Sequence, residues 1–171
     1  MPQVGQFRLG DYAAVRALWK EAGLDNSPGD ELVQLRRKIK RDPGFFLVAR
    51  EGNMVSGAVL GAWDGRRGWI YHLAVSKSAR RQGVGTALLQ ELERRMRAKG
   101  VLKVNAIVYD WNVASLALFE KNGFRPQRGQ VVMGKYLTRA SRPRPEAIFR
   151  PAARASGRPC GTPTNSRSVH V

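Results

Sequence analysis

The spacing of apolar residues along the chain predicts an alternation of helices and strands. Apolar side chains recur every three or four residues in some segments, as in a helix with one buried face, and run continuously or alternately in others, as in strands. The predicted helices cover residues 11–22, 31–41, 83–99 and 113–121. The predicted strands cover residues 4–8, 45–50, 54–63, 69–75, 103–109, 124–128 and 131–137. The order β-αα-βββ-α-β-α-ββ indicates an α/β (α+β) fold with helices on the faces of a mixed sheet.

Capping and turn residues support these boundaries. Asp11 and Asp30 each precede a segment with helical spacing, and both are predicted to cap the N-terminus of that helix. Asp42-Pro43-Gly44 is predicted to end the second helix, because Pro cannot continue it. Asp64-Gly65-Arg66-Arg67-Gly68 is predicted to form a turn between two strands.

Residues 139–171 differ in composition from the rest of the chain. They hold seven Arg and one Glu, a net charge of +6, and five Pro. Ala147-Ile148-Phe149 is their one apolar cluster, so they bury too little surface to offset the entropy of ordering. We therefore expect one domain over residues 1–138, followed by a basic Pro/Arg-rich tail that is disordered.

The charge of the chain indicates an anionic partner without identifying it. The sequence has 30 Lys and Arg against 13 Asp and Glu, for a net charge of +17. Residues 1–138 carry +11 of this, with 23 basic and 12 acidic residues. Nucleic acid, an acidic substrate and a phosphate-rich cofactor all fit such a charge. The Arg residues of the tail are a second place where nucleic-acid phosphates would bind.

Composition also excludes several classes of protein. A single cysteine, Cys160, excludes an intramolecular disulfide and a Cys-based zinc site, so no metal is expected. No apolar run approaches the length of a membrane-spanning helix, and no membrane partner is expected. The first residues lack the basic and apolar pattern of a signal peptide, so the expected location is the cytoplasm.

The segment with the clearest chemical pattern runs from Leu73 to Leu89. An apolar strand ends at Leu73-Ala74-Val75, a basic turn follows, and two glycines open a strongly periodic helix. Backbone N–H groups at a helix N-terminus lack intrahelical partners and carry the positive end of the helix dipole. Gly83 and Gly85 let a ligand approach the backbone closely, and Arg80 and Arg81 add positive charge. The pattern predicts a diphosphate site.

Two common diphosphate motifs do not match. No Lys follows the glycines as a P-loop requires, and Leu88 stands where a dinucleotide-binding fingerprint needs its third glycine. The pattern Arg80-x-x-Gly83-x-Gly85 after Leu-Ala-Val instead resembles the acyl-coenzyme A (acyl-CoA) signature of the GNAT superfamily of N-acetyltransferases.

A second motif supports this resemblance. The segment 108–124, with Asn112 before a helix that ends Phe-Glu-Lys-Asn-Gly-Phe, is similar to the later motif of the same family. The two motifs and the strand order cover roughly residues 3–138. The turn Asp64-Gly65-x-Arg67-Gly68 is similar to a small bacterial branch of acetyltransferases, which also resembles the ribosomal-protein N-terminal acetyltransferases.

The resemblance implies a binding site for acetyl-CoA. In the family, the strand that holds Leu73-Ala74-Val75 parts from the next strand of a mostly antiparallel sheet, and pantetheine lies between these splayed central strands. The diphosphate would bind N–H groups from Arg81 to Thr86, and Asn112 would contact the pantetheine arm. The implied coenzyme-binding residues are Leu73, Ala74, Val75, Arg80, Arg81, Gln82, Gly83, Val84, Gly85, Thr86, Asn112 and Phe119.

The resemblance also implies direct acyl transfer from the thioester to an amine, with the N–H of Val75 stabilising the oxyanion. Here the sequence departs from the family. The usual Tyr acid is replaced by Phe119, and the usual carboxylate positions hold Trp69 and Ile107. The candidates left as catalytic residues are Tyr109 and His72, with Tyr71 and Asp110 as further polar side chains nearby.

Three functions therefore remain open at this point. The first is an N-acetyltransferase that uses acetyl-CoA and a primary amine, the amine being a peptide or a small molecule. The second is an acyl-CoA-binding module without turnover, as the missing acid and base suggest. The third is a basic nucleic-acid-binding protein. A homodimer through the final hairpin is common in the family.

Overall fold

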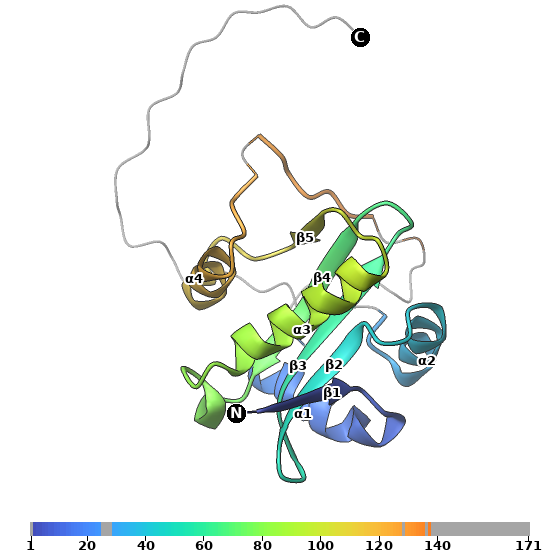
Figure 1. Cartoon of the computed structure of the whole chain (residues 1–171), viewed down its shortest axis with the longest axis vertical. Coiled ribbons are helices and arrows are strands. Elements are labelled where there is room, and N and C mark those ends of the chain that lie inside the picture. The colour runs from blue at the N-terminus through green and yellow to red at the C-terminus, as the bar shows by residue number, and fades with distance from the viewer. Residues whose placement is uncertain (1, 25–28, 128, 136, 138–171) are drawn as a thin grey trace, which may run out of the picture.

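One sheet organises the chain in the computed structural model, which describes residues 2–24, 29–127, 129–135 and 137 (Figure 1). Its strands are β1 (Gln3–Gln6), β2 (Phe46–Glu51), β3 (Met54–Trp63), β4 (Gly68–Val75) and β5 (Val104–Ala106). The α-helices are α1 (Tyr12–Glu21), α2 (Leu32–Arg41), α3 (Val84–Ala98) and α4 (Val113–Lys121). Short 3-10 turns at Leu9–Asp11 and Lys77–Ala79 precede α1 and follow β4.

The strands lie in the order β1-β2-β3-β4-β5, and all neighbours are antiparallel except β4 and β5. The parallel pairing of β4 with β5 is short, because its last pair is Ile70 with Ala106. β4 continues to Val75, whereas β5 ends at Ala106, so the C-terminal part of β4 has no pairing with β5. The predicted mixed, mostly antiparallel sheet with splayed central strands is therefore confirmed.

Helices cover both faces of the sheet, as the apolar spacing predicted. On one face, α1 buries Val15, Leu18 and Trp19 against the sheet, and α2 adds Leu35. The rings of Trp19 and Phe7 stack on Phe46 of β2, with centroids 5.8 and 4.0 Å away. On the other face, α3 crosses the sheet (Figure 1) and buries its apolar stripe, which consists of Val84, Leu88, Leu89, Leu92 and Met96.

Glycines in β3 allow α3 to lie close to the sheet. A Cβ atom at Gly57 would stand 2.9 Å from Cγ1 of Val84, and one at Gly61 would stand 2.8 Å from Cδ1 of Leu92. Both distances are shorter than two carbon atoms tolerate. The absence of side chains at these positions thus fixes the height of α3 above β3.

The predicted final hairpin is wrong for the residues that the structure describes. No strand forms over 124–127, 129–135 or 137, and the fifth strand covers Val104–Ala106 instead of 103–109. Val131 and Met133 are 84% and 89% exposed, so their apolar pattern has no neighbouring strand or core to pack on. Strand formation depends on such neighbours more than on intrinsic preference, which explains the difference.

Other expectations concern residues outside the described ranges. The predicted tail, residues 139–171 with Cys160, lies there. In the described part of the chain, no helix combines the length and apolar content needed to cross a membrane.

Candidate acyl-transfer site

A β-bulge in β4 marks the place where the strands part. Ala58 of β3 faces Ala74 and Leu60 faces Tyr71, so the single residue Val59 lies opposite both His72 and Leu73. His72 adopts a φ of +44°, a left-handed conformation that is uncommon outside glycine. The bulge begins just beyond Ile70, the last residue of β4 that pairs with β5.

The C-terminal part of β4 carries the predicted pantetheine residues. Leu73 and Val75 are half-buried and pack against the core on the α3 face, whereas Ala74 is buried on the α1 face. Because β5 does not pair here, the backbone edge of Leu73–Val75 on that side has no strand partner in the described residues. An extended ligand with amide groups fits such an edge by adding to the sheet.

The turn after β4 is exposed and left-handed at two positions. Arg81 has a φ of +63° and Gly83, the N-cap of α3, a φ of +84°. Nε of Arg80 donates to the carbonyl oxygen of Val75 at 3.3 Å, and Nε2 of Gln82 donates to that of Ser78 at 2.8 Å. These contacts hold the turn at the end of β4 while the residues from Arg80 to Gly83 face solvent.

The first turn of α3 has the properties of an anion site. No side chain caps it, and the N–H groups of Val84 to Thr86 precede the first intrahelical bond, from Ala87 to Gly83. A Cβ atom at Gly83 would meet nothing within 4 Å, so the approach from solvent is open. The donors, the helix dipole and the nearby guanidinium groups suit the phosphates of a nucleotide coenzyme.

Gly85 has a second reason to be glycine. A Cβ atom at this position would lie 2.8 Å from Cδ2 of Leu118 in α4. The side chain of Asn122 also reaches Thr86, with Nδ2 donating to Oγ1 at 3.4 Å. Gly85 and Thr86 therefore join α3 to α4, and their packing role is independent of any ligand.

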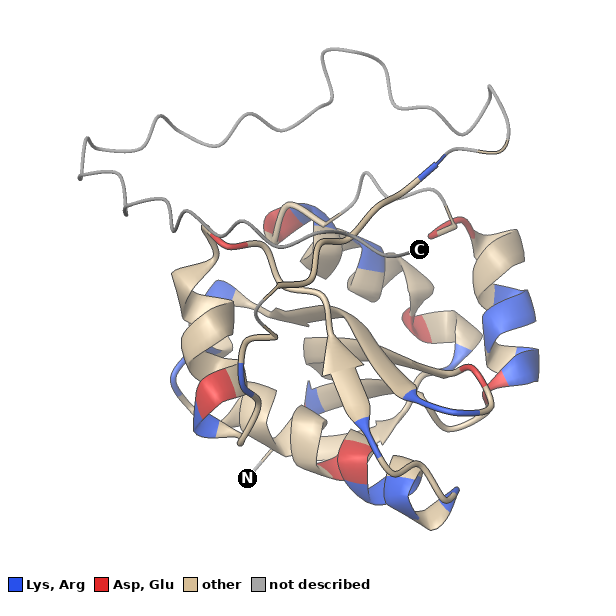
Figure 2. Ribbon diagram, turned by 90° about the horizontal axis from the view of Figure 1, so that it is seen from above, with Lys and Arg blue, Asp and Glu red and all other residues tan. Residues whose placement is uncertain are grey.

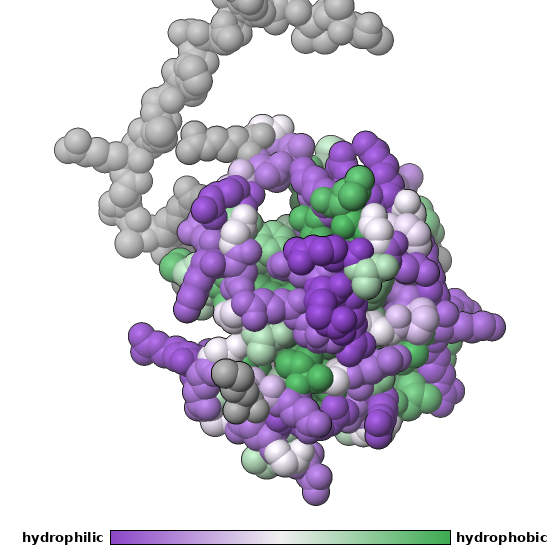
Figure 3. Space-filling model, in the orientation of Figure 1, coloured by the Kyte–Doolittle hydropathy of each residue, from purple (hydrophilic) through white to green (hydrophobic). Residues whose placement is uncertain are grey.

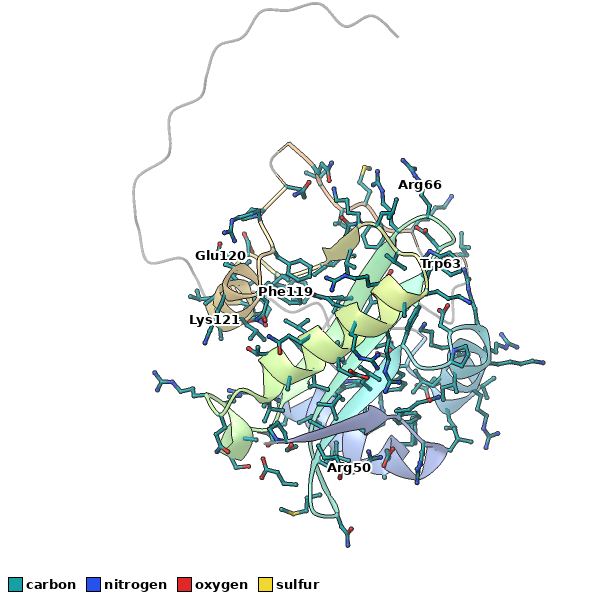
Figure 4. The ribbon with its side chains drawn as sticks, viewed as in Figure 1. Arg50, Trp63, Arg66, Phe119, Glu120 and Lys121 are labelled. Carbon is teal, nitrogen blue, oxygen red and sulfur yellow. The ribbon has the colours of Figure 1, made fainter. Side chains whose placement is uncertain are left out.

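On α4, the predicted coenzyme residues have clear structural partners. Oδ1 of Asn112 accepts the N–H of Ser115 at 3.1 Å and caps the helix. Phe119 is 7% exposed and meets the ring of Phe124 edge-on at 5.0 Å. Figure 4 shows Phe119 pointing from α4 toward α3, with Lys121 directed away.

A hollow lies beside β5 and α4, away from the α3 turn. It has a volume of about 1170 Å³, and residues 72–86 do not line it. Trp69, Val104, Phe119 and Phe124 contribute apolar walls, and Figure 3 shows green surface between hydrophilic rims in this region. This is the side of β5 where the predicted hairpin did not form.

The two positions that usually carry a carboxylate in the family are occupied differently here. Nε1 of Trp69 donates to Oδ2 of Asp64 at 3.0 Å, and Ile107 is 48% exposed. Hydrogen bonds from the backbone of Arg67, from Trp69 and from the backbone of Arg66 lower the pKa of Asp64 to about 2. Such a carboxylate is a poor proton acceptor at neutral pH.

The tyrosines differ in their surroundings. Tyr109 is 62% exposed, and its ring stacks on Trp111 at 5.2 Å with a 15° interplanar angle. Tyr71 is half-buried beside the core on the α1 face, and burial, with the charge of Asp64 second, raises the pKa of its phenol. Tyr71 therefore keeps its proton at neutral pH.

In the structure, His72 contacts Asp30, a residue that the sequence pattern predicted to cap α2. Nε2 of His72 lies 2.8 Å from Oδ2 of Asp30, and the imidazole meets Trp19 edge-on at 5.0 Å. Asp30 was predicted to cap α2, but the N-cap is Glu31. With adjacent acidic residues before the helix, the sequence offers no signal that would separate the cap from the partner of a distant histidine.

No group of three His, Cys, Asp or Glu side chains within the described residues could hold a metal ion.

Comparison with known proteins agrees with this geometry. The profile of the Acetyltransferase (GNAT) family matches residues 12–124. Acetyltransferase SG1711 of Sodalis glossinidius (strain morsitans) is 33% identical over 135 residues, which cover 79% of this chain and 95% of that protein.

Solved structures share the fold at lower sequence identity. The ribosomal-protein-S18-alanine N-acetyltransferase from Escherichia coli has a TM-score of 0.57 and 18% identity, with 73% of this chain and 78% of that chain covered. AAC(6')-Iy, in complex with the bisubstrate analog CoA-S-monomethyl-acetylneamine, has a TM-score of 0.64 and 16% identity, with 80% and 99% covered. The family match, the acetyltransferase relative and the shared fold show that this chain is an acyltransferase enzyme of the GNAT family.

Proposed function

We propose that the chain transfers an acetyl group from acetyl-CoA directly to a primary amine. The observation that carries this proposal is the open, uncapped first turn of α3, reached through the left-handed turn Arg81–Gly83 directly after β4. The anion site and the unpaired strand edge of Leu73–Val75 are thus neighbours in the chain. In coenzyme A, a diphosphate is likewise joined to an amide-containing arm, so one ligand could occupy both neighbouring sites.

In this proposal the diphosphate binds the backbone N–H groups from Arg81 to Thr86, a segment that includes Gln82, Val84 and Gly85. The guanidinium groups of Arg80 and Arg81 are exposed beside this segment and would neutralise phosphate charge. Pantetheine would pair with the backbone of Leu73 and Val75, beside Ala74. The amide of Asn112 and the ring of Phe119 would border the arm from α4.

When bound, acetyl-CoA supplies an activated acyl group, because its thioester carbonyl is open to attack by an amine. The N–H of Val75 would donate to the oxygen of that carbonyl as negative charge develops on it. Two of the solved structures support an amine acceptor, since one is a ribosomal-protein-S18-alanine N-acetyltransferase and the other holds the bisubstrate analog CoA-S-monomethyl-acetylneamine.

The test is thiol release from acetyl-CoA against a panel of primary amines, which includes peptides, lysine, polyamines and amino sugars. The matched variants are Gly83→Glu and Gly100→Glu, at opposite ends of α3. Both glycines have a positive φ, +84° and +88°, and neither has a neighbour within 4 Å.

The backbone strain of the two variants is therefore alike, but only Gly83→Glu places a carboxylate at the anion site. We expect Gly83→Glu to abolish CoA binding and Gly100→Glu to retain it, as measured by calorimetry. Equal affinity in both variants would place the coenzyme elsewhere. Thiol release with none of the amines, despite CoA binding, would exclude the proposed reaction.

A further inference from the structure

We propose that His72 and Asp30 form the proton-accepting pair of the acceptor site, with His72 taking a proton from the incoming ammonium and Asp30 positioning its ring. This inference rests on the proposed function. It concerns the step for which the sequence offers neither the usual tyrosine nor the usual carboxylates.

His72 lies where the pairing of β4 with β5 ends. β4 and β5 pair up to Ile70, and Leu73 begins the unpaired edge. His72 lies between these residues, on the bulge where the gap opens. A thioester held along Leu73–Val75 would therefore end beside the backbone of His72.

The carboxylate of Asp30 is buried beside His72. The side chain of Asp30 is 7% exposed, and that of His72 is 17% exposed. A buried carboxylate is costly unless it is hydrogen-bonded. Asp30 does not cap α2, and its side chain is hydrogen-bonded to Nε2 of His72 at 2.8 Å. Capping of α2 therefore does not explain the hydrogen bond between Asp30 and His72.

The contact with Asp30 also selects the tautomer of His72. A carboxylate beside Nε2 accepts the Nε2–H and leaves the lone pair of the neutral ring on Nδ1. The edge-on contact with Trp19 restrains the plane of the ring at the same time. Nδ1 has no hydrogen-bond partner among the described residues. The available basic atom of the pair is therefore Nδ1.

The backbone of His72 points the same way. Its φ of +44° is a conformation that most side chains avoid, and such outliers persist only where surrounding contacts hold them. The bulge turns the ring toward α1 and Asp30. In a regular strand without the bulge, the side chains of residues 72 and 73 would simply point to opposite faces of the sheet.

The reaction balances as follows. Nδ1 of His72 removes one proton from the R–NH₃⁺ group, which leaves a neutral amine and an imidazolium paired with the Asp30 carboxylate. The amine nitrogen bonds to the acyl carbon, and the bond from that carbon to sulfur breaks. The nitrogen gives its second proton to the sulfur, and the imidazolium returns its proton to solvent. The products are an amide, a thiol and one proton, without oxidation or reduction.

The principal variant is His72→Asn, because Asn tolerates a left-handed backbone but cannot act as a base. We expect its kcat to fall by about 100-fold or more, the usual contribution of a general base. Its KM for acetyl-CoA and its CoA affinity should stay at the wild-type values. His72→Gly also suits the backbone and leaves room for a free ring, so added imidazole should raise its rate and leave that of His72→Asn unchanged.

The role of Asp30 is tested without turnover. Imidazole ¹⁵N shifts of the coenzyme-free protein should show the proton of His72 on Nε2, and Asp30→Asn should shift the tautomer toward Nδ1–H. The same variant should lower kcat with little change in KM. His170, the other histidine, is identified by its loss in His170→Gln.

Two results would overturn the inference alone. They are a wild-type ring protonated on Nδ1 and a His72→Asn variant with undiminished kcat. The proposed function fails separately, through CoA binding without turnover on any amine or through loss of the difference between Gly83→Glu and Gly100→Glu. A turnover-active enzyme in which His72→Asn is silent would keep the proposed function and remove this pair from it.

Discussion

Gly83 and Gly85 lie two residues apart at the start of α3, yet a side chain would meet different surroundings at each. At Gly83 it would face open solvent, and at Gly85 it would press on Leu118. The φ of Gly83 is +84°, so the backbone itself favours glycine there. One glycine therefore shapes the turn beside the proposed anion site, and the other sets the contact between α3 and α4.

Asn112 combines a role in folding with a proposed role in binding, and two substitutions separate them. Asn112→Ala removes the cap of α4 and should lower the free energy of unfolding by about 1 kcal/mol. Asn112→Ser keeps a capping oxygen, so its stability should equal that of the wild type. Urea denaturation measures both changes.

If the amide also contacts pantetheine, both variants should raise the dissociation constant of CoA, and Asn112→Ser should do so without loss of stability. A wild-type CoA affinity in Asn112→Ser would restrict this residue to its capping role. The comparison assigns one measurement to each function of the side chain.

Among single residues, the sequence predicts the proposed anion site more directly than the proposed His72–Asp30 pair. The turn between β4 and α3 is a local pattern, and its glycines and arginines lie within six positions of one another in the chain (residues 80–85). The pairing of His72 with Asp30 spans 42 positions and depends on how α1 and α2 pack on the sheet. Sequence spacing carries no information about such a contact.

The position of α3 depends on close contact with β3. Gly57 and Gly61 place the backbone of the strand directly beneath Val84, Leu92 and Met96. Val84 stands at the first position of the helix, so the contact at Gly57 also locates the first turn. The distance of α3 from the sheet is thus set by the two glycines of β3.

Gly57→Ala tests this contact, because its Cβ would lie 2.9 Å from Val84 and 3.2 Å from the carbonyl oxygen of Ala74. We expect a loss of about 1–3 kcal/mol in the free energy of unfolding, as for other overpacked cores. Gly10→Ala is the matched control, since a Cβ there meets nothing within 4 Å. Equal stability of the two variants in urea would show that α3 moves freely.

The charges on α3 predict opposite effects of pH at two neighbouring positions. Hydrogen bonds from Arg94 and then Arg95 lower the pKa of Glu91 to about 2, whereas burial raises the pKa of Glu93. Glu91 therefore stabilises the fold above the unfolded pKa of about 4.3, and this contribution is lost as pH falls toward 2.

Glu93 has the reverse sign, because its raised pKa makes the fold less stable as pH rises above the unfolded value. We expect Glu91→Gln to flatten the dependence of stability on pH between about 2 and 4.3. Glu93→Gln should instead raise stability, relative to the wild type, at pH above about 4.3. Thermal unfolding across this range measures both, and parallel curves for the two variants would contradict the assignment.

At the scale of elements, the helices and the first strands follow from the apolar periodicity. The final hairpin does not, because alternating apolar residues form a strand only where another strand is available to pair with them. β5 ends at Ala106, and Val131 and Met133 remain exposed. The sequence pattern therefore predicts elements more securely near the centre of the sheet than at its edge.

The charge of the whole molecule is arranged so that many acidic groups have internal partners. Among the described residues, ion pairs join Asp11 to Arg50, Asp42 to Lys38, and Glu91 to Arg94 and Arg95, and Asp30 is hydrogen-bonded to His72. Asp64 is held by the turn after β3. Figure 2 shows Lys and Arg grouped along the outer side of α2. The outward charge is therefore strongly positive.

This charge predicts that salt weakens the use of acetyl-CoA, because screening reduces the attraction of its phosphates to the surface. We propose that residues 1–138 form the catalytic domain, so deletion of residues 139–171 should leave the rise of KM with ionic strength unchanged. Steady-state kinetics of the two proteins at several salt concentrations measure this. A much weaker salt dependence after the deletion would instead give the tail a role in binding anions.

The contact of α3 with Gly57 and Gly61 has a thermodynamic consequence. Since β3 has no side chains at these points and the side chains of α3 pack directly on its backbone, the first turn of α3 has little freedom to slide along the sheet. A ligand that bridges the two elements meets donors already in place. The entropy cost of fixing these donors in place arises when the chain folds, so ligand binding does not incur that cost again.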